Sequence, residues 1–199
     1  MNKKILIGIT GGIGAGKSIV SSIIESEGYY VLKSDVTAKE IMQKDEEVKK
    51  NIIEYFGKES YINDKLNTEY LADKIFSSKE NVEKINSIVH PKTIKKTLEL
   101  AEKEFQKSNY VFVESALIYE AKIQDYFDYI ILVYSDEQTR IKRIVERDKV
   151  NEEKIRRRME FQIPDEKKKE WADFVIVNNN DKDELKKKVL FILSLIKSL

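Results

Sequence analysis

The feature that most constrains the fold of this chain is the segment GGIGAGKS at residues 11–18. It fits the pattern Gly-x-x-x-x-Gly-Lys-Ser/Thr, with an apolar run before it at residues 5–9 and a helical pattern after it at residues 17–27. Glycines let a backbone wrap closely around phosphate oxygens with its N–H groups turned inward. The N-terminus of a following helix favours the same negative charge. The segment therefore predicts a phosphate-binding loop rather than a glycine-rich turn without a ligand.

Two side chains at the end of this loop indicate a nucleoside triphosphate as its ligand. Lys17 can reach the β- and γ-phosphates, and the hydroxyl of Ser18 can hold Mg²⁺. We expect the nucleotide to contact every residue of the loop and the residue that follows it, namely Gly11, Gly12, Ile13, Gly14, Ala15, Gly16, Lys17, Ser18 and Ile19.

Composition limits the remaining classes of protein. The 199 residues suit one domain with an inserted subdomain or lid, and a hydrophobic fraction of 41% is ordinary for a folded chain. The 36 Lys and Arg residues against 35 Asp and Glu give a net charge of +1, which favours neither a nucleic-acid partner nor a membrane partner. The absence of cysteine excludes disulfides and thiol catalysis. No apolar run matches a signal-peptide core or a membrane span, so we expect a cytoplasmic protein.

Short apolar runs alternate with helical patterns along the chain, and this alternation predicts an α/β fold. A phosphate-binding loop directly after the first strand is typical of P-loop proteins, whose sheets are mostly parallel. The expected strands cover residues 4–9, 30–32, 110–114, 129–133 and 173–177.

The region between the second and third expected strands is almost entirely helical. It covers residues 36–107, far more than a crossover between parallel strands needs, and we interpret it as an insertion that shapes a substrate site. A turn is expected at Asn63 and Asp64, and a helix is expected to start at Thr68. His90 and Pro91 should end one helix, with Pro91 at the first position of the next.

Several charged residues are candidates for phosphate chemistry. Asp35 follows the second strand at the edge where ligands of α/β sheets bind, although Asp before a helix is equally common as an N-cap. Arg143 and Arg147 are spaced i, i+4 on an expected helix and either cover phosphates or form a solvated face. Glu114 ends the third strand and is suited to orient Mg²⁺. His90 is read either as a structural residue before Pro91 or as a base.

Phosphoryl transfer to a small molecule needs an acceptor site, a carboxylate near the acceptor hydroxyl and mobile positive charge over the phosphates. The chain meets each need in turn. The helical insertion offers an acceptor site, Asp35 is the carboxylate, and the positive charge comes from the arginine-bearing helices expected at 136–146 and 150–162. P-loop α/β folds occur in phosphotransferases and in nucleotide switches or motors, and with these three features we predict a P-loop kinase fold of the α/β class. It would have a five-stranded, mostly parallel sheet flanked by helices, a helical substrate-binding insertion and a helical lid.

The residues resemble those of the bacterial dephospho-CoA kinase family over essentially the full length of the chain. The opening IGITGGIGAGKS at 7–18 is similar to that family's start, and YVLKSD at 30–35 is similar to its Asp-x-Asp segment. Further along the chain, similar segments are His90-Pro91, LIYE at 117–120, RIVERD at 143–148, RMEFQ at 158–162 and DFVIVN at 173–178.

The chain departs from the family pattern at a few positions. Only the second aspartate of Asp-x-Asp is kept, as Asp35, and no departure removes a group that phosphoryl transfer strictly needs. The departures are Ile19 for threonine, Lys33 for the first aspartate, Glu114 for aspartate, Ala116 for proline and Asn180 for glycine.

The resemblance implies that ATP and dephospho-CoA are the substrates and that Mg²⁺ accompanies ATP. The γ-phosphate would pass to the ribose 3′-hydroxyl of dephospho-CoA, the last step of coenzyme A biosynthesis. The nucleotide-binding core would cover residues 1–35, 108–142 and 172–199, the dephospho-CoA-binding insertion 36–107 and the lid 143–171. The alternatives are another small-molecule or nucleoside monophosphate kinase and a P-loop nucleotide switch without transfer.

The resemblance also implies a role for each matching residue. Asp35 would act as base, with Lys17 and Arg143 as the other catalytic residues and Ser18 as the Mg²⁺ ligand, joined by Glu114. Arg147 and Asn178 would bind the nucleotide together with the loop. The acceptor would contact Asp35, His90, Leu117, Glu120, Arg158 and Gln162.

Overall fold

The computed structural model describes residues 3–198, and within them the chain forms two compact units. One unit is built from the segment that ends at Leu32 and the segment that begins at Ala101. The other unit is Lys33–Leu100. The phosphate-binding loop belongs to the first unit, and most of the expected helical insertion belongs to the second.

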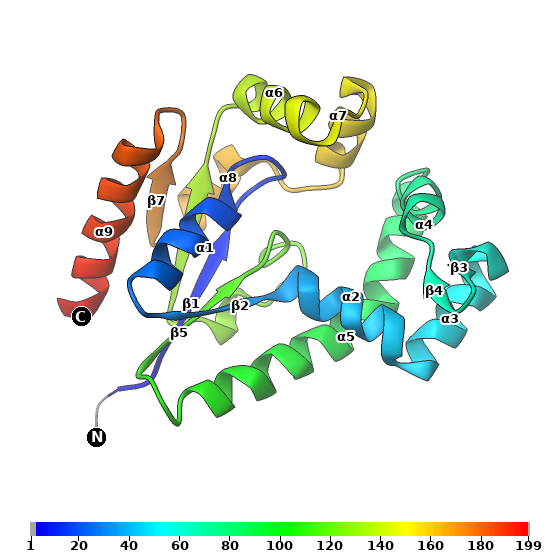
Figure 1. Cartoon of the computed structure of the whole chain (residues 1–199), viewed down its shortest axis with the longest axis horizontal. Coiled ribbons are helices and arrows are strands. Elements are labelled where there is room, and N and C mark those ends of the chain that lie inside the picture. The colour runs from blue at the N-terminus through cyan, green and yellow to red at the C-terminus, as the bar shows by residue number, and fades with distance from the viewer. Residues whose placement is uncertain (1–2, 199) are drawn as a thin grey trace. The chain divides into compact units, whose positions relative to one another are not determined.

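The first unit contains the five-stranded sheet, in the order β2-β5-β1-β6-β7 (Figure 1). Strand β1 pairs in parallel with β5 and β6, and β6 pairs in parallel with β7. The strands are β1 (Ile5–Thr10), β2 (Tyr30–Lys33), β5 (Tyr110–Glu114), β6 (Tyr129–Tyr134) and β7 (Phe174–Val177). The five predicted strands are therefore confirmed. Because β1 is central and its neighbours come from later in the chain, the loop after β1 opens at the switch point where α/β sheets bind ligands.

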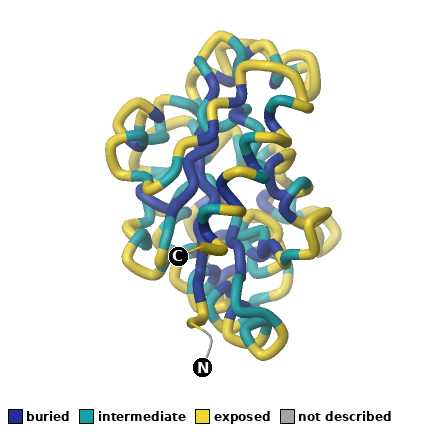
Figure 2. The backbone as a smooth tube through the Cα atoms, turned by 90° about the vertical axis from the view of Figure 1, so that its left-hand side faces the viewer, coloured by how far each residue is buried: buried dark blue, intermediate teal, exposed yellow. Residues whose placement is uncertain are grey.

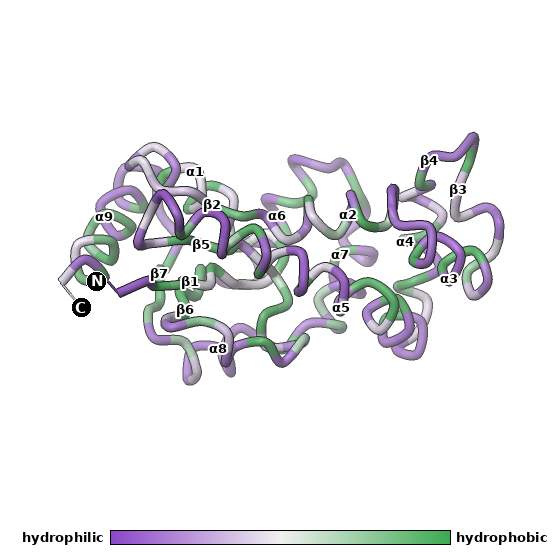
Figure 3. The backbone as a smooth tube through the Cα atoms, turned by 90° about the horizontal axis from the view of Figure 1, so that it is seen from below, coloured by the Kyte–Doolittle hydropathy of each residue, from purple (hydrophilic) through white to green (hydrophobic). Residues whose placement is uncertain are grey.

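The strands are apolar because the sheet is covered on both faces. All six residues of β1 are buried, as are the four central residues of β6. The strands give the longest dark-blue stretches in Figure 2, and β1 and β6 are mostly green in the hydropathy view of Figure 3. A near-continuous apolar run is the pattern of a parallel strand buried on both sides.

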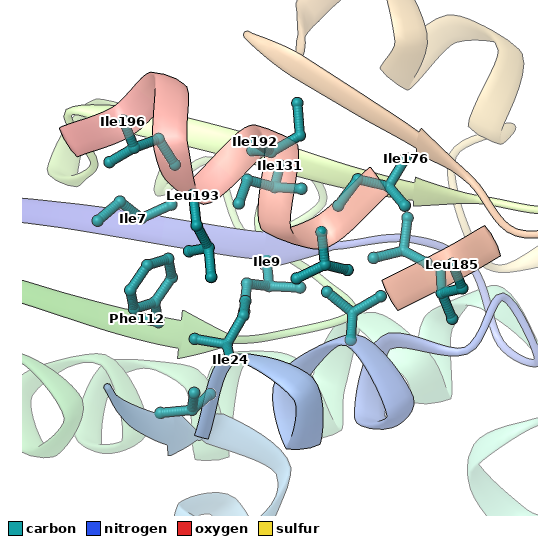
Figure 4. Close-up of a cluster of buried hydrophobic side chains, with 14 of the residues drawn as sticks. Ile7, Ile9, Ile24, Phe112, Ile131, Ile176, Leu185, Ile192, Leu193 and Ile196 are labelled. Carbon is teal, nitrogen blue, oxygen red and sulfur yellow. The ribbon is translucent and has the colours of Figure 1, made fainter. Parts of the chain in front are cut away.

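Two helices cover one face of this sheet. Helix α1 (Lys17–Ser26) and helix α9 (Lys182–Ser198) lie over the strands and share one core with them. Figure 4 shows this core, in which Ile24 from α1 and Leu193 from α9 meet the strand residues Ile9 and Phe112. Burying each such side chain stabilises the fold by roughly 1.5–3 kcal/mol. The loop at the start of α1 is thus anchored to a rigid base.

The remaining helices of the first unit follow β6 and precede β7. They are α6 (Glu137–Asp148), α7 (Glu152–Glu160) and α8 (Asp165–Trp171), and a 3₁₀ turn, Gln124–Tyr126, precedes β6. The first two confirm the helices expected at 136–146 and 150–162. No separate helix was predicted between Pro164 and β7, although these residues were included in the expected helical lid at 143–171. Helix α8 has only seven residues, too few for a periodic pattern, but Pro164 at its N-cap and acidic Asp165 and Glu166 in its first turn are start signals.

The second unit is helical and has a core of its own. Its helices are α2 (Ser34–Lys44), α3 (Glu46–Phe56), α4 (Thr68–Ile75) and α5 (Lys79–Glu104), which runs on beyond the unit. A 3₁₀ turn, Lys58–Ser60, leads into a small hairpin of β3 (Tyr61–Ile62) and β4 (Lys65–Leu66). The core consists of Val48, Ile52, Phe56, Leu71, Ile85 and Val89.

The hairpin confirms the turn predicted at Asn63 and Asp64. Both residues have positive φ, 49° and 66°. Two such residues in succession form the turn that matches the twist of a tight hairpin, and Asn and Asp tolerate this conformation better than other non-glycine residues.

The prediction for His90 and Pro91 is wrong, because α5 continues through both residues without a break. Proline removes one helical N–H bond, and the carbonyl that loses it is that of Ser87. Ser87 is exposed, so water can solvate that carbonyl. On the opposite side Val89 is buried in the core, and the Thr93 hydroxyl donates a hydrogen bond to its carbonyl at 2.9 Å. Packing on this face therefore outweighs the local preference of proline.

Within residues 3–198, the helices are all too short or too polar to cross a lipid bilayer.

Candidate active site

The phosphate-binding loop connects β1 to α1 and needs glycine at both of its ends. Gly11 has φ 146° and Gly16 has φ 97°, conformations that L side chains rarely adopt. A Cβ on Gly11 would lie 2.2 Å from the carbonyl oxygen of Val133, and one on Gly16 would lie 2.2 Å from Nδ2 of Asn178. Glycine at these positions lets the loop fit between β6 and the turn after β7.

Lys17 and Ser18 begin helix α1 at the end of this loop. The Lys17 ammonium group donates to the carbonyl oxygens of Gly11 and Gly12 at 2.8 and 3.3 Å. These bonds hold the lysine side chain across the loop, so a phosphate bound in the loop would have the ammonium group beside it. The Ser18 residue is exposed in the first helical turn. Cation, hydroxyl and helix N-terminus are thus gathered at one place, as phosphate binding requires.

Two side chains far away in the sequence hold backbone N–H groups of the loop. The carboxylate Oδ2 of Asp165 accepts from the N–H of Gly12 at 3.0 Å. The amide Oε1 of Gln162 accepts from the N–H of Ile13 at 2.9 Å. Gln162 was expected on the acceptor, whereas here it contacts the phosphate-binding loop. Asp165 was not predicted from the sequence, in which the start signals of α8 are the only pattern that points to it.

Asn178 ties the turn after β7 to the same loop. Its Nδ2 donates to the carbonyl oxygen of Ala15 at 2.8 Å, and its own N–H donates to the carbonyl of Tyr134 at 2.7 Å. Asn178 is buried, and its carbonyl accepts from the hydroxyl of Ser135 at 3.0 Å. This residue, expected at the nucleotide, therefore supports the loop through the Ala15 carbonyl.

The predicted arginines lie on α6 and α7 in different environments. Arg143 donates from Nη1 to the hydroxyl of Ser135 at 3.3 Å, next to the turn that Asn178 begins. Arg147 is exposed and makes a two-pronged contact with Asp148 at 2.7 and 2.8 Å. This pair lowers the pKa of Asp148 and raises that of Arg147. Arg158 is half-buried on α7. Arg143 is thus connected, through Ser135, to the residues that support the loop.

Glu120 and Leu117 lie in the segment after β5. Oε1 of Glu120 accepts from the N–H of Ile163 at 3.0 Å and lies 2.8 Å from the ammonium group of Lys168. The N–H of Leu117 donates to the hydroxyl of Ser115 at 3.4 Å. Glu120, expected on the acceptor, thus has protein partners in this structure.

Glu114 is the last residue of β5 and is in register with Ile9 of β1, just before the loop. Its Oε2 is buried and has no hydrogen-bond partner within the described residues. A buried carboxylate oxygen without a donor is what a hydrated cation would satisfy. Residues 3–198 contain no group of three or more His, Cys, Asp or Glu side chains placed to hold a metal ion. The partnerless carboxylate oxygen of Glu114 is a hard donor of the kind that Mg²⁺ and its water shell prefer.

In the second unit, Asp35 is the second residue of α2 and is exposed. The N-cap position belongs to Lys33, so Asp35 does not occupy the capping position considered as its alternative role. A carboxylate in the first turn still gains from the helix dipole. His90 is half-buried in the middle of α5.

The second unit also contains cavities of a size that could hold part of a small molecule. One of about 610 Å³ is bordered by α3 and α5, with Asn51, Tyr55 and Pro91 among its lining residues. Another of about 490 Å³ is bordered by α2 and α5 and is lined by Thr37, Ile41 and four lysines. The lysines are Lys44, Lys92, Lys95 and Lys96, and the same cavity is also lined by the carboxylates Glu40, Asp45 and Glu99.

The sheet is parallel, and the phosphate-binding loop follows its central strand. Polar residues from three later segments hold this loop. These features define a P-loop kinase fold. The sequence model of the dephospho-CoA kinase family matches residues 5–184, and the chain belongs to this family.

Curated relatives agree with this assignment. The dephospho-CoA kinase of Listeria monocytogenes is 35% identical over 195 residues, which cover 96% of this chain and 98% of that protein. The dephospho-CoA kinase of Fusobacterium nucleatum is 37% identical over 186 residues, covering 93% and 95%.

Solved structures show the same fold. The protein TT1252 of Thermus thermophilus is 29% identical with a TM-score of 0.81, and the match covers 97% of each chain. The dephospho-CoA kinase of Campylobacter jejuni is 26% identical with a TM-score of 0.63 and the same coverage. A shikimate kinase of Acinetobacter baumannii, at 19% identity and a TM-score of 0.52, shares the fold alone.

Proposed function

We propose that this protein transfers the γ-phosphate of ATP to the ribose 3′-hydroxyl of dephospho-CoA and releases CoA and ADP. In this reaction the bond between the γ-phosphorus and the β–γ bridging oxygen breaks, a bond from the 3′-oxygen to phosphorus forms, and the hydroxyl proton leaves. The observation that carries the proposal is the family match over residues 5–184, which includes a phosphate-binding loop with its lysine in place.

At the nucleotide, the loop and its neighbours would act mainly by position and charge. The ammonium group of Lys17 would exchange its contacts with two loop carbonyls for contacts with the β- and γ-phosphates. Arg143 would add positive charge at the transferring group, and Arg147 would leave Asp148 to contact ATP. Phosphoryl transfer has a loose transition state, so such fixed charges supply most of the rate enhancement.

Magnesium fits the residues at the end of the loop. The Ser18 hydroxyl would hold the ion directly, and the partnerless Oε2 of Glu114 would accept from its water shell. When bound with ATP, the ion neutralises charge on the β- and γ-phosphates.

At the acceptor, we assign Asp35 as the general base that accepts the 3′-hydroxyl proton. A carboxylate in this role aligns the hydroxyl and contributes about 10²–10⁴-fold in rate. The cavity of about 490 Å³ in the second unit is lined by four lysines and three carboxylates, and this small excess of positive charge would favour the diphosphate of dephospho-CoA. His90, Leu117 and Arg158 complete the proposed acceptor contacts. Glu120 and Gln162 would contribute through the protein contacts described above.

The experiment that tests this function measures ADP release from Mg·ATP with and without dephospho-CoA, with CoA quantified by chromatography. We expect strong stimulation, with one CoA formed per ADP. Stimulation by a nucleoside or nucleoside monophosphate instead would identify another small-molecule kinase. Slow hydrolysis without stimulation by any acceptor would overturn kinase activity and favour a nucleotide switch.

A further inference from the structure

A cluster of four charged side chains, two buried and two nearly so, lies beside the phosphate-binding loop, and the roles proposed above give no part to Asp165, Lys168 or Arg140. Asp165 and Lys168 come from α8, Arg140 comes from α6 and Glu120 comes from the segment after β5. The side chain of Lys168 is fully buried, that of Asp165 is 3% exposed, and Glu120 and Arg140 are 10% and 12% exposed. The cluster joins segments that are widely separated in the sequence.

The charges alternate through the cluster. Arg140 Nη1 lies 3.2 Å from Asp165 Oδ2, and Lys168 Nζ lies 3.8 Å from the other oxygen, Oδ1. Lys168 Nζ also lies 2.8 Å from Glu120 Oε1. Two cations therefore face two anions, and the cluster has no formal net charge.

The cluster reaches the loop at Gly12. Oδ2 of Asp165, the oxygen that pairs with Arg140, also accepts from the N–H of Gly12 at 3.0 Å. A Cβ on Gly12 would lie 2.0 Å from Arg140 Nη1 and 2.7 Å from Asp165 Oδ2. A larger residue here would push the Arg140 and Asp165 side chains away, so glycine at this position lets the carboxylate lie directly on the loop backbone.

Stability alone gives little reason for charges at this place. Desolvating ions is costly, and well-packed apolar side chains often replace a buried ion pair without loss of stability. Apolar side chains cannot, however, accept a hydrogen bond from the Gly12 N–H. What the charged cluster provides, and apolar side chains cannot, is a carboxylate oxygen held in a fixed position to accept from the Gly12 N–H.

We propose that Asp165 is a positioning residue that sets the conformation of the phosphate-binding loop through the Gly12 N–H before the nucleotide arrives, and that Arg140 fixes the direction of its carboxylate. Neither residue needs to touch the nucleotide. A loop that is already shaped loses less conformational freedom when ATP binds, and its remaining N–H groups are already aimed at the phosphates. The inference rests on the proposed function only in that this loop binds ATP.

The first test compares Asp165→Ala and Asp165→Asn with wild type, using ADP affinity by calorimetry and kcat and KM for ATP. A lost hydrogen bond to a charged group predicts about tenfold or greater weakening of ADP binding in Asp165→Ala. Asp165→Asn keeps an acceptor oxygen for Gly12 and should recover part of that loss. Glu166→Ala is the matched control, because Glu166 is an exposed carboxylate on the same helix that bonds to Tyr134. Wild-type ADP affinity in a folded Asp165→Ala protein would overturn the proposal.

A second variant separates positioning from stability. Arg140→Met with Asp165→Leu replaces the ion pair by apolar side chains, and we expect the thermal unfolding midpoint to be near that of wild type or above that of Asp165→Ala. ADP affinity should stay about tenfold low, because no acceptor for Gly12 has been restored. A double variant with wild-type affinity would show that the pair serves stability alone.

Hydrogen exchange gives a measurement that does not depend on how well the variants fold. In nucleotide-free wild type, the Gly12 amide should be protected from exchange, and ADP should add little further protection there. Rapid exchange of this amide, slowed only by ADP, would overturn the proposal. ADP affinity, thermal unfolding and hydrogen exchange need no acceptor, so a failure of dephospho-CoA as acceptor would remove only the kinetic readout and leave these tests intact.

Discussion

Nδ2 of Asn178 lies 2.8 Å from the carbonyl oxygen of Ala15, so the turn after the last strand is fastened to the middle of the phosphate-binding loop. The contact is buried and links residues 163 positions apart in the sequence. The side chain also fills the space that a Cβ on Gly16 would need. The last strand of the sheet and the first loop of the chain are therefore parts of one site.

Asn178→Ala should destabilise the protein and weaken ATP binding together. The substitution leaves the buried Ala15 carbonyl without its donor, which costs about 1–3 kcal/mol. Urea unfolding and KM for ATP measure the two effects. Asn180→Ala is the control, since Asn180 is exposed and bonds to Glu184 on the surface. If Asn178→Ala lowers stability but leaves KM for ATP unchanged, the residue supports the fold and not the loop conformation.

Lys17→Ala should abolish most turnover while the protein stays folded. Its ammonium group contacts loop carbonyls, and Lys17 is not a residue of the buried apolar core that stabilises the sheet. The loss of a cation at the transferring phosphate should lower kcat by about 10²-fold or more and weaken ATP binding. Lys186→Ala, at an exposed lysine of α9, controls for the change in net charge. Wild-type kcat in Lys17→Ala would contradict the assignment of the phosphate-binding loop itself.

Ser18→Ala should raise the Mg²⁺ concentration needed for half-maximal activity, because the variant removes the hydroxyl ligand assigned to the ion. An increase of about tenfold corresponds to a loss of about 1.4 kcal/mol of binding free energy. Titration of MgCl₂ at fixed ATP measures it, and excess EDTA should stop wild-type turnover. The control is Ser22→Ala, one helical turn further on, whose hydroxyl donates to the Ser18 carbonyl. An equal shift in both variants would show that the raised Mg²⁺ requirement comes from a change in helix α1 and not from the loss of a ligand to the ion.

The central part of this site could be predicted from the sequence because its signals are local. A glycine spacing, one lysine and one serine within eight residues define the loop, and the apolar runs around it identify the strand and the helix. The five strands could be predicted for the same reason, because each strand is a continuous apolar run between polar turns.

The support of the loop could not be predicted, because it comes from contacts without sequence spacing. Gly12 bonds to Asp165 and Ile13 to Gln162 only because α8 and the connection that leads into it lie near the loop in the folded chain. Arg140 and Arg143 lie on the same helix, and nothing in the local sequence indicates that Arg140 is the arginine that pairs with Asp165. The unbroken helix at Pro91 has a similar cause, since packing in the second unit outweighs a local rule.

Acid should weaken the second unit through Asp45. This residue caps α3 by accepting from the Val48 N–H at 3.0 Å, and it pairs with Lys92 at 2.6 Å. The hydrogen bond from Lys92, and then that from Val48, lowers the pKa of Asp45 below its ordinary 3.8. A lowered folded-state pKa means that the contribution to stability is present above pH 3.8 and is lost as pH falls through the folded-state value.

Lys92→Met tests this pH dependence. The variant should lower the urea midpoint at pH 7 by a small amount, because the pair lies near the surface. The difference from wild type should shrink as pH falls below 3.8, where Asp45 takes up its proton in either protein. Lys79→Met serves as control, since its pair with Glu83 is more exposed. A difference that stays constant down to pH 2 would show that Lys92 stabilises the unit by packing and not by its charge.

Asp35→Asn should lower kcat by about 10²-fold or more and leave KM for ATP nearly unchanged, because the amide cannot accept the hydroxyl proton. Helix α2 should remain intact, since its N-cap is Lys33 and Asp35 is exposed. Glu69→Gln is the matched control: Glu69 is the second residue of α4, as Asp35 is of α2, and is also exposed. Any effect of removing a charge from a first helical turn should appear in both variants. Weaker ATP binding with unchanged kcat in Asp35→Asn would exclude Asp35 as the base and would require another acceptor for the 3′-hydroxyl proton.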